Sequence, residues 1–286
     1  MKKWFEIKNK ADKAEIWIYE EIGEDWWTGE GVTAKSFQKE LSAIKASQID
    51  LHINSPGGQA FEGITIYNLL KQHSAKVTTY IDGLAGSIAS VIALSGDKVF
   101  MAENALFMMH EPSGYAFGNS EEMRKTADLL DKVGRSISLA YQDKSGKDEK
   151  EIKDLMVDVS WLSAQEAKGL GFVDEITGAA DMTACAKFVP IMEKAKFKNI
   201  PKNFLNIVNQ TKTPTIRETE QVLRDAGFSS VRAKAILAEG FKDEQRDVVP
   251  PEPDTHSQDQ RDVDPPDKKK DRVADLLARA SVVALI

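Results

Sequence analysis

The sequence predicts an α/β protein with largely parallel strand pairing and a helical C-terminal extension. Over residues 14–178, short apolar segments typical of strands alternate with amphipathic segments typical of helices. After residue 190 the chain becomes basic and weakly periodic, then helical, then rich in proline. We therefore expect an α/β domain at 1–190, a helical hairpin extension at 191–240, a disordered proline-rich linker at 241–271 and an apolar C-terminal helix at 272–286.

The predicted strands and helices of the first region follow one another in a regular order. Residues 14–19 alternate between apolar and polar, as a half-buried strand does. Thr33 is a suitable N-cap for a helix that runs through Phe37, Leu41 and Ile44. The remaining strands are expected at 49–53, 77–81, 98–101, 106–109 and 172–176, and the remaining helices at 61–72, from Ile88, at 121–144, at 148–157 and within 161–167.

The longest predicted helix, 121–144, has one continuous apolar face. The residues of this face recur every three or four positions, which is the helical period: Met123, Ala127, Leu130, Gly134, Ile137 and Tyr141. Such a face usually packs on the core of its own domain, and contact with a partner subunit is compatible with it.

The C-terminal region combines a helical pattern with a proline-rich one. Thr215 is positioned to cap a first helix and Gly227 to end it before a second helix begins. Residues 241–271 contain five of the ten prolines among polar residues, and such a segment buries too little apolar surface to order itself. Residues 272–286 read as an apolar helix too short to fold alone, so we expect it to dock on another surface.

Composition argues against several classes of function. The net charge of −7 includes no strongly basic region, so a nucleic-acid partner has no electrostatic support. The longest apolar run, Ile88–Leu94, is too short to cross a membrane, and no secretory signal is expected at the N-terminus. The single cysteine, Cys185, excludes an internal disulfide and favours a cytoplasmic location. The sequence has no metal-ligand motif and no glycine-rich phosphate loop, so neither a metal nor a cofactor is expected.

Three segments contain residues suited to catalysis. The turn Asn54–Gly58 (NSPGG) follows an apolar strand and exposes backbone N–H groups that can bind an oxyanion. Ser87, in GLAGSIAS, lies where a strand gives way to a helix, a geometry that exposes its hydroxyl near a helix N-terminus. His110 ends the strand LFMMH before a loop, where it can reach a serine as a base. Each segment also has an ordinary interpretation, namely a plain turn, a helix-capping serine and a structural histidine.

Taken together and in this order, the three segments resemble the proteolytic-subunit (ClpP) family of Clp proteases. That family has a strand ending in SPGG, then G-x-A-x-S, then a histidine after an apolar strand, and the similarity continues through YQDKSGKDEKEIKDLM and SAQEAKGLGFVDEI. The resemblance covers residues 14–178 and implies a ClpP/crotonase-like spiral of ββα units, a serine endopeptidase acting on protein substrates, and ring-forming homo-oligomers. Carried over by position, it implies Ser87 as nucleophile, His110 as general base, and the backbone N–H groups of Gly58 and Ile88 as the oxyanion hole.

One position departs from the pattern of the family. The family's third catalytic residue is an acid two positions before the aromatic that precedes L-S-A. That aromatic is Trp161 here, and the acid position holds Val159. We prefer the neighbouring Asp158 as third residue, with a Ser–His dyad or an orienting backbone carbonyl as alternatives. Asp174 belongs to the GFVDE segment and is expected to be structural.

Segments outside the catalytic region indicate a more specific role. The start IYEEIGEDWWTGEGVTAKSFQKEL and the hairpin RETEQVLRDAGFSSVRAKAILAEG resemble the ClpP-like proteases of tailed phages and prophages. This resemblance implies an ATP-independent head maturation protease that cleaves scaffold and capsid protein in the host cytoplasm or in an immature phage head. Three alternatives stay open: a host-type ClpP peptidase working with an unfoldase ATPase, a crotonase that holds a thioester enolate, and a non-catalytic assembly protein of the same fold.

Overall fold

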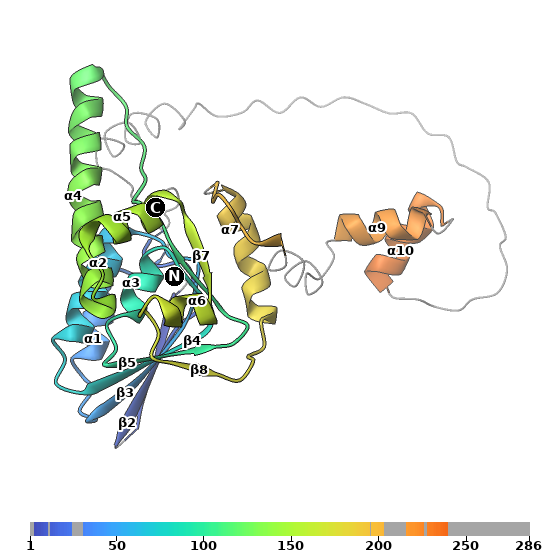
Figure 1. Cartoon of the computed structure of the whole chain (residues 1–286). Helices are drawn as coiled ribbons and strands as arrows, with labels where there is room; N and C mark the ends of the chain where they lie inside the picture. The colour runs from blue at the N-terminus through green and yellow to red at the C-terminus, as the bar shows by residue number, and fades with distance from the viewer. Residues whose placement is uncertain are drawn as a thin grey trace, which may run out of the picture. The chain divides into compact units, whose positions relative to one another are not determined.

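The fold is described from a computed structural model of the chain (Figure 1). The structure describes residues 3–10, 12–24, 31–194, 196–202, 216–225 and 228–239. The described residues up to 202 belong to one compact unit, and those from 216 belong to another. The first unit contains every described strand and all the residues predicted to act in catalysis.

The strands of the first unit form one mixed sheet. They are β1 (Phe5–Asn9), β2 (Lys13–Ile18), β3 (Gln48–Ser55), β4 (Lys76–Gly86), β5 (Lys98–Ala102), β6 (Leu106–Met109), β7 (Ser160–Ser163) and β8 (Glu175–Thr177). Their order is β1-β2-β3-β4-β5-β8, and β6 pairs with both β4 and β7. Pairing is antiparallel in β1–β2 and β6–β7 and parallel in the other described pairs. The predicted α/β class with largely parallel pairing is therefore confirmed.

Strand β4 is the branch point of the sheet. Its residues Thr78–Ile81 pair with β5, whereas Leu84–Gly86 pair with β6. The pairing of β3 with β4 shifts register between Ile53 and Ser55, and such irregularities bend a sheet. Because β4 changes neighbour along its length, its carboxyl end lies between β3 and β6. Ser87 directly follows this end.

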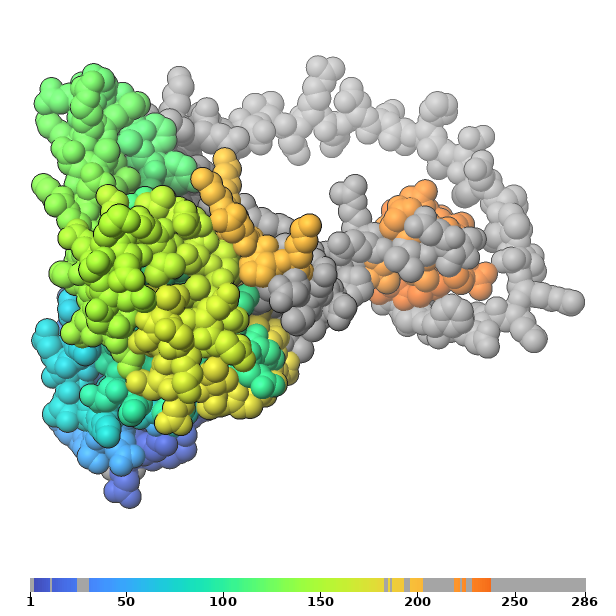
Figure 2. Space-filling view, in the orientation of Figure 1, coloured from blue at the N-terminus to red at the C-terminus, as the bar shows by residue number. Residues whose placement is uncertain are grey.

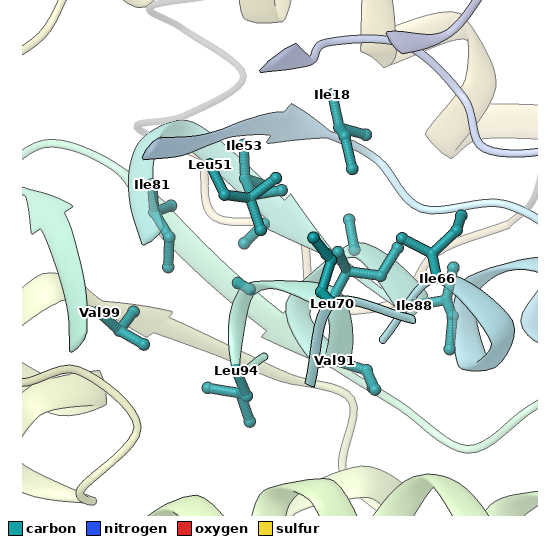
Figure 3. Close-up of a cluster of buried hydrophobic side chains, with 14 of the residues drawn as sticks. Ile18, Leu51, Ile53, Ile66, Leu70, Ile81, Ile88, Val91, Leu94 and Val99 are labelled. Atoms are coloured by element: carbon teal, nitrogen blue, oxygen red, sulfur yellow. The ribbon is translucent and has the colours of Figure 1, made fainter. Parts of the chain in front are cut away.

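Helices pack on the sheet and enclose the main core. They are α1 (Ala34–Leu41), α2 (Ala60–Lys71), α3 (Ile88–Ala93), α4 (Ser120–Ser145), α5 (Glu149–Val157), α6 (Ala164–Gly169) and α7 (Val189–Lys194), with a 3-10 helix, η1, at Thr183–Phe188. Figure 3 shows part of this core, formed by buried side chains of β2 to β5, α2, α3 and the residue after α3: Ile18, Leu51, Ile53, Ile81, Val99, Ile66, Leu70, Ile88, Val91 and Leu94. Burial of these apolar side chains stabilises the unit and fixes α3 immediately after the candidate nucleophile.

Helix α4 packs on the unit over only part of its length. Asn119 caps it with a reciprocal capping box to Glu122. The predicted apolar face is buried at Ile137 and Tyr141, but Met123 is 49% exposed, and the first turns of the helix extend past the neighbouring helices (Figure 1). The unit's own core therefore covers this face in the second half of the helix, whereas Met123 in the first half stays exposed.

The chain continues to pack on the first unit beyond the predicted boundary at residue 190. A second cluster of buried side chains joins the sheet to η1 and α7: Leu84, Met182, Cys185, Phe188, Val189 and Met192. In the second unit, α9 (Ile216–Asp225) and α10 (Ser230–Glu239) contact each other, in the region where the hairpin was predicted. The predicted caps Thr215 and Gly227, the linker 241–271 and the helix 272–286 lie outside the described residues.

Four strands differ from the sequence-based expectation. Strand β7 was not predicted, since residues 161–167 were assigned to a helix; that helix, α6, begins only at Ala164, because residues 161–163 pair with β6. Strand β1 was not predicted, because Phe5 is its only fully buried residue and the alternation is weak. Strand β4 continues beyond the predicted end at Ile81, because β6 offers backbone partners to the glycine-rich GLAG segment. Strand β8 begins at Glu175 rather than residue 172, because Phe172 and Val173 are core residues that precede it.

Candidate active site

Ser87 occupies a strained backbone position at the junction of β4 and α3. Its φ of 51° and ψ of −129° are unusual for a residue with a side chain. The Ser87 N–H donates to the Met108 carbonyl at 3.0 Å, so pairing of β4 with β6 holds the strained residue in place. The Ser87 hydroxyl makes no capping hydrogen bond to α3 and instead lies 2.7 Å from Nε2 of His110. The helix-capping interpretation of Ser87 is therefore not supported.

His110 reaches Ser87 because of the parallel pairing of β4 with β6. Gly86 of β4 lies opposite Met108 of β6, so the residues that follow the two strand ends come together. Burial lowers the pKa of His110 to about 4, and a backbone hydrogen bond with Glu111 acts in the opposite direction. The ring is therefore neutral at neutral pH, with Nε2 free to accept a proton from the Ser87 hydroxyl.

The glycine turn packs directly against Ser87. Gly57 and Gly58 have φ values of 107° and 144°, which side chains strongly disfavour. A Cβ atom on Gly57 would lie 2.6 Å from the Ser87 Cβ, so only glycine permits this approach. The Ile22 N–H donates to the Gly57 carbonyl, and the Ile22 carbonyl accepts from the Gln59 N–H, so neither bond uses the Gly58 N–H. Within the described part of the chain, we find no hydrogen bond of the Gly58 N–H or the Ile88 N–H.

A chain of two buried hydrogen bonds links the backbone of Ser87 to α3 and α4. The Ser90 hydroxyl donates to the Ser87 carbonyl at 2.6 Å and lies 2.7 Å from the Tyr141 hydroxyl. Since the Ser90 hydrogen is used on Ser87, Tyr141 is the donor in the second bond. Burial raises the pKa of Tyr141, which keeps this donor protonated. Helix α4 thus positions Ser87 through α3, a connection that the sequence did not reveal.

Among the described residues, no carboxylate forms a hydrogen bond or ion pair with His110. Val159, at the family's acid position, has a φ of 52°, which is a strained value for a β-branched residue. Asp158 caps the end of α5, and its carbonyl accepts a hydrogen bond from the Asn199 amide at 2.9 Å. No hydrogen bond joins the Asp158 carboxylate to His110 among the described residues.

Asp174 has structural partners. Its carboxylate accepts hydrogen bonds from the Val99 N–H at 2.7 Å and from the Lys144 ammonium at 2.6 Å. Burial acts to raise the pKa of Asp174, but the bonds from Lys144 and Val99 outweigh it and lower the pKa. Asp174 thus joins β5 to α4.

Other titratable groups of the first unit have structural partners as well. His52 Nδ1 lies 2.8 Å from the Asp82 carboxylate, and His73 accepts the Ala75 N–H. Burial raises the pKa of Cys185 to about 12, so its thiol stays protonated, and it donates to the Asn54 side chain.

Three further features of the described residues concern metal binding, membrane spanning and cavities. They contain no group of side chains that could hold a metal ion. None of their helices is long and apolar enough to cross a membrane. A cavity of about 400 Å³ opens between α4 and α5 beside Glu111 and Pro112, but neither Ser87 nor His110 lines it.

A serine on a strained strand-to-helix turn, bonded to a neutral histidine and flanked by free backbone N–H groups, is the arrangement of serine hydrolases. Comparison with known families is consistent with this class, because the model of the family described as Clp protease matches residues 2–180. The chain belongs to the Clp protease family, a family of serine-type peptidases. Family membership and the mixed sheet together confirm the predicted ClpP-like α/β fold.

Individual relatives point the same way. The ATP-dependent Clp protease proteolytic subunit of Leuconostoc citreum is 35% identical over 133 residues, which is 45% of this chain and 66% of the relative. The subunit of the same name from Bacteroides fragilis is 33% identical over 151 residues, which is 50% of this chain and 72% of the relative. The chain thus spans about two thirds of the length of these relatives. A solved structure of a ClpP1 mutant from Listeria monocytogenes has a TM-score of 0.49 and 26% identity, covering 57% of this chain and 90% of that one.

The burial of His110 predicts an unusual titration. Of the four histidines, we expect one to titrate at about pH 4 in an NMR titration of the imidazole Cε1 protons, because the buried site disfavours the charged ring. This signal should be absent in His110→Gln, while the other histidine signals remain. A His110 midpoint near the ordinary value of 6.5 would contradict the buried environment.

Proposed function

We propose that the chain is a serine endopeptidase in which Ser87 is the nucleophile and His110 the general base. The observation that carries this proposal is the 2.7 Å contact between the Ser87 hydroxyl and His110 Nε2. Ser87 Oγ attacks the carbonyl carbon of a peptide bond while its proton passes to His110 Nε2. The N–H groups of Gly58 and Ile88 stabilise the oxyanion, and His110 then returns the proton to the leaving amine. Water, deprotonated by His110, releases the acyl group from Ser87.

A homo-oligomer, ring-forming as in the family, is part of the proposal. Large apolar side chains are exposed on the first half of α4 and on the loop before it: Tyr115, Phe117, Met123 and Leu129. Exposed apolar groups gathered in one region favour contact between protein surfaces. A second copy of the chain is a suitable partner for this surface, since α4 leaves its predicted apolar face partly uncovered.

Head maturation of a tailed phage is the biological role that we propose. The support is the resemblance of residues 18–41 and of residues 217–240 to phage-type ClpP-like proteases, together with a chain that continues well past the family match at residue 180. The relatives named above are ATP-dependent proteolytic subunits, and their names favour the alternative of a peptidase working with an unfoldase. Val159 favours the third possibility, a non-catalytic assembly protein.

Labelling with a fluorophosphonate probe tests the nucleophile. We expect the probe to modify Ser87 alone, since among the described residues this is the hydroxyl that lies within hydrogen-bond distance of a histidine ring nitrogen. Peptide mapping should locate the label, Ser87→Ala should abolish it, and His110→Ala should slow it by about 100-fold or more. Denatured protein is the control for nonspecific reaction. Absence of labelling in every assembly state would favour the non-catalytic assembly protein.

Two carboxylate variants test the third catalytic residue. We expect Asp158→Asn to lower kcat by less than about tenfold, because no bond from its carboxylate orients His110. The matched variant Asp174→Asn should reduce thermal stability, because it weakens the link to Lys144, and leave kcat similarly little changed. Steady-state hydrolysis of a peptide and thermal unfolding are the measurements. A loss of about 1,000-fold or more in Asp158→Asn alone would make Asp158 the orienting acid.

Substrate and energy requirements distinguish the biological alternatives. We expect the purified protein to cleave phage capsid and scaffold proteins without ATP, as measured by the masses of the products. Ser87→Ala is the control for contaminating proteases. Cleavage only in the presence of a Clp unfoldase and ATP would replace the maturation role by the host-type role. Binding of acyl-CoA without proteolysis would revive the crotonase alternative.

A further inference from the structure

The segment Lys196–Ile200, here called the cover segment, lies against the catalytic histidine. The ring of Phe197 is 5.3 Å from the ring of His110 and 6.3 Å from the ring of Trp161, measured between centroids. Phe197 also packs on the cluster that contains Leu84, three residues before the nucleophile. An aromatic side chain from beyond the family match therefore occupies the surroundings of the candidate base.

Specific hydrogen bonds hold the cover segment over the site. The Trp161 indole N–H donates to the Lys198 carbonyl at 2.9 Å, and the Asn199 amide donates to the Asp158 carbonyl at 2.9 Å. The Phe197 N–H donates to the Met192 carbonyl at 3.0 Å, which ties the segment to α7. These bonds give the segment a defined position next to β7, the strand that pairs with β6.

The preceding residues fix the segment on the other side of the site. Cys185 and Phe188 of η1 pack against Leu84 of β4, and Cys185 donates to the Asn54 side chain at 3.1 Å. Lys187 forms an ion pair with Glu20 at 2.8 Å. The chain thus passes from the glycine-turn side of the site to the β7 side, and Phe197 lies along this path.

With the cover segment in place, Ser87 is little exposed and the pKa of His110 is low. Ser87 exposes only 9% of its surface, so a polypeptide has little room to approach its hydroxyl. Burial also holds the pKa of His110 far below neutral, whereas a general base works best with a pKa near the working pH. Moving an aromatic ring away from His110 would admit water, raise its pKa and open the site.

We propose that the cover segment is an autoinhibitory pseudo-substrate. Phe197 fills an apolar subsite between His110 and Trp161 that takes a large apolar side chain of the substrate, so a substrate has to displace it. The inference rests on the proposed peptidase function and adds a substrate class to it. Release of the segment is favoured by its own backbone, since Lys196 and Asn199 have left-handed φ values of 53° and 59°.

The test compares variants of the full chain that release the cover segment with one that does not. Phe197→Ala removes the ring from the subsite, and Asn199→Ala removes one of the hydrogen bonds without touching His110. Phe228→Ala is the matched control, because it removes the same ring in the second unit. The first readout is the rate of fluorophosphonate labelling of Ser87. The second is trypsin cleavage after Lys196 and Lys198 in a Ser87→Ala background, which reports opening of the segment without catalysis.

We expect Phe197→Ala to be labelled about tenfold faster than the wild type, as release of a half-buried aromatic ring corresponds to about one order of magnitude in the open fraction. Asn199→Ala should show a smaller increase, and Phe228→Ala none. Trypsin cleavage after the two lysines should accelerate in the same order. In the wild type, peptides with a large aromatic residue beside the scissile bond should be hydrolysed faster than peptides with aspartate there.

The possible failures are distinguishable. In one outcome the wild type is labelled, trypsin cleavage of the two variants accelerates, and yet both variants are labelled no faster than the wild type. This outcome leaves the peptidase function standing and overturns the autoinhibitory role. Unchanged trypsin cleavage together with unchanged labelling overturns it as well. If neither the wild type nor any released variant is labelled, the proposed peptidase function itself fails, and the inference fails with it.

Discussion

The close approach of two backbone turns determines the geometry of the candidate site. The turn after β3 lies against the end of β4, with Gly57 so near Ser87 that a Cβ atom has no room. This contact exists because β3 and β4 pair in parallel and both end at the same edge of the sheet. Substitution of Gly57 would push apart the strand ends that bring the glycine turn to the serine. The conformation of Ser87, its bond to His110 and the Gly58 N–H, which has no hydrogen bond among the described residues, all depend on the approach of these turns.

The branching of β4 supplies the second half of the arrangement. A parallel sheet that continued straight from β4 to β5 would leave the end of β4 with β3 as its neighbour on one side and none on the other, whereas β6 fills that place and brings His110 with it. In this position the His110 ring is buried, and burial disfavours its charged form. The same burial keeps His110 neutral and therefore able to accept a proton. Tyr141 and Ser90 complete the support on the far side of Ser87, so three separate elements fix one strained residue.

Short sequence segments predicted the main residues of the candidate site. Features that depend on contacts between residues far apart in the sequence could not be predicted. The glycine turn, the serine between strand and helix, and the histidine at a strand end are each visible in short segments, and their order identified the family. The exposure of Met123 was not predictable, because periodicity gives the face of a helix but not the length of the surface that it packs on. The Phe197–His110 contact joins residues far apart in sequence, and nothing in the segment around Phe197 signals a partner. The position of Asp158 was also out of reach, since it depends on the backbone conformation at Val159.

The strained Val159 and the cover segment are parts of one arrangement. In the family, this position supplies an acid; here the left-handed turn at Val159 presents a β-branched apolar side chain at a φ that such residues avoid. Neighbouring contacts keep the backbone in this strained conformation. One of them is the hydrogen bond that Asn199, a residue of the cover segment, donates to the Asp158 carbonyl. Displacing the segment would therefore remove one hydrogen bond to the backbone next to Val159. In the proposed mechanism, release of Phe197 changes the surroundings of His110 directly, because the two rings are in contact, and it frees the Asp158 carbonyl from Asn199 at the same time.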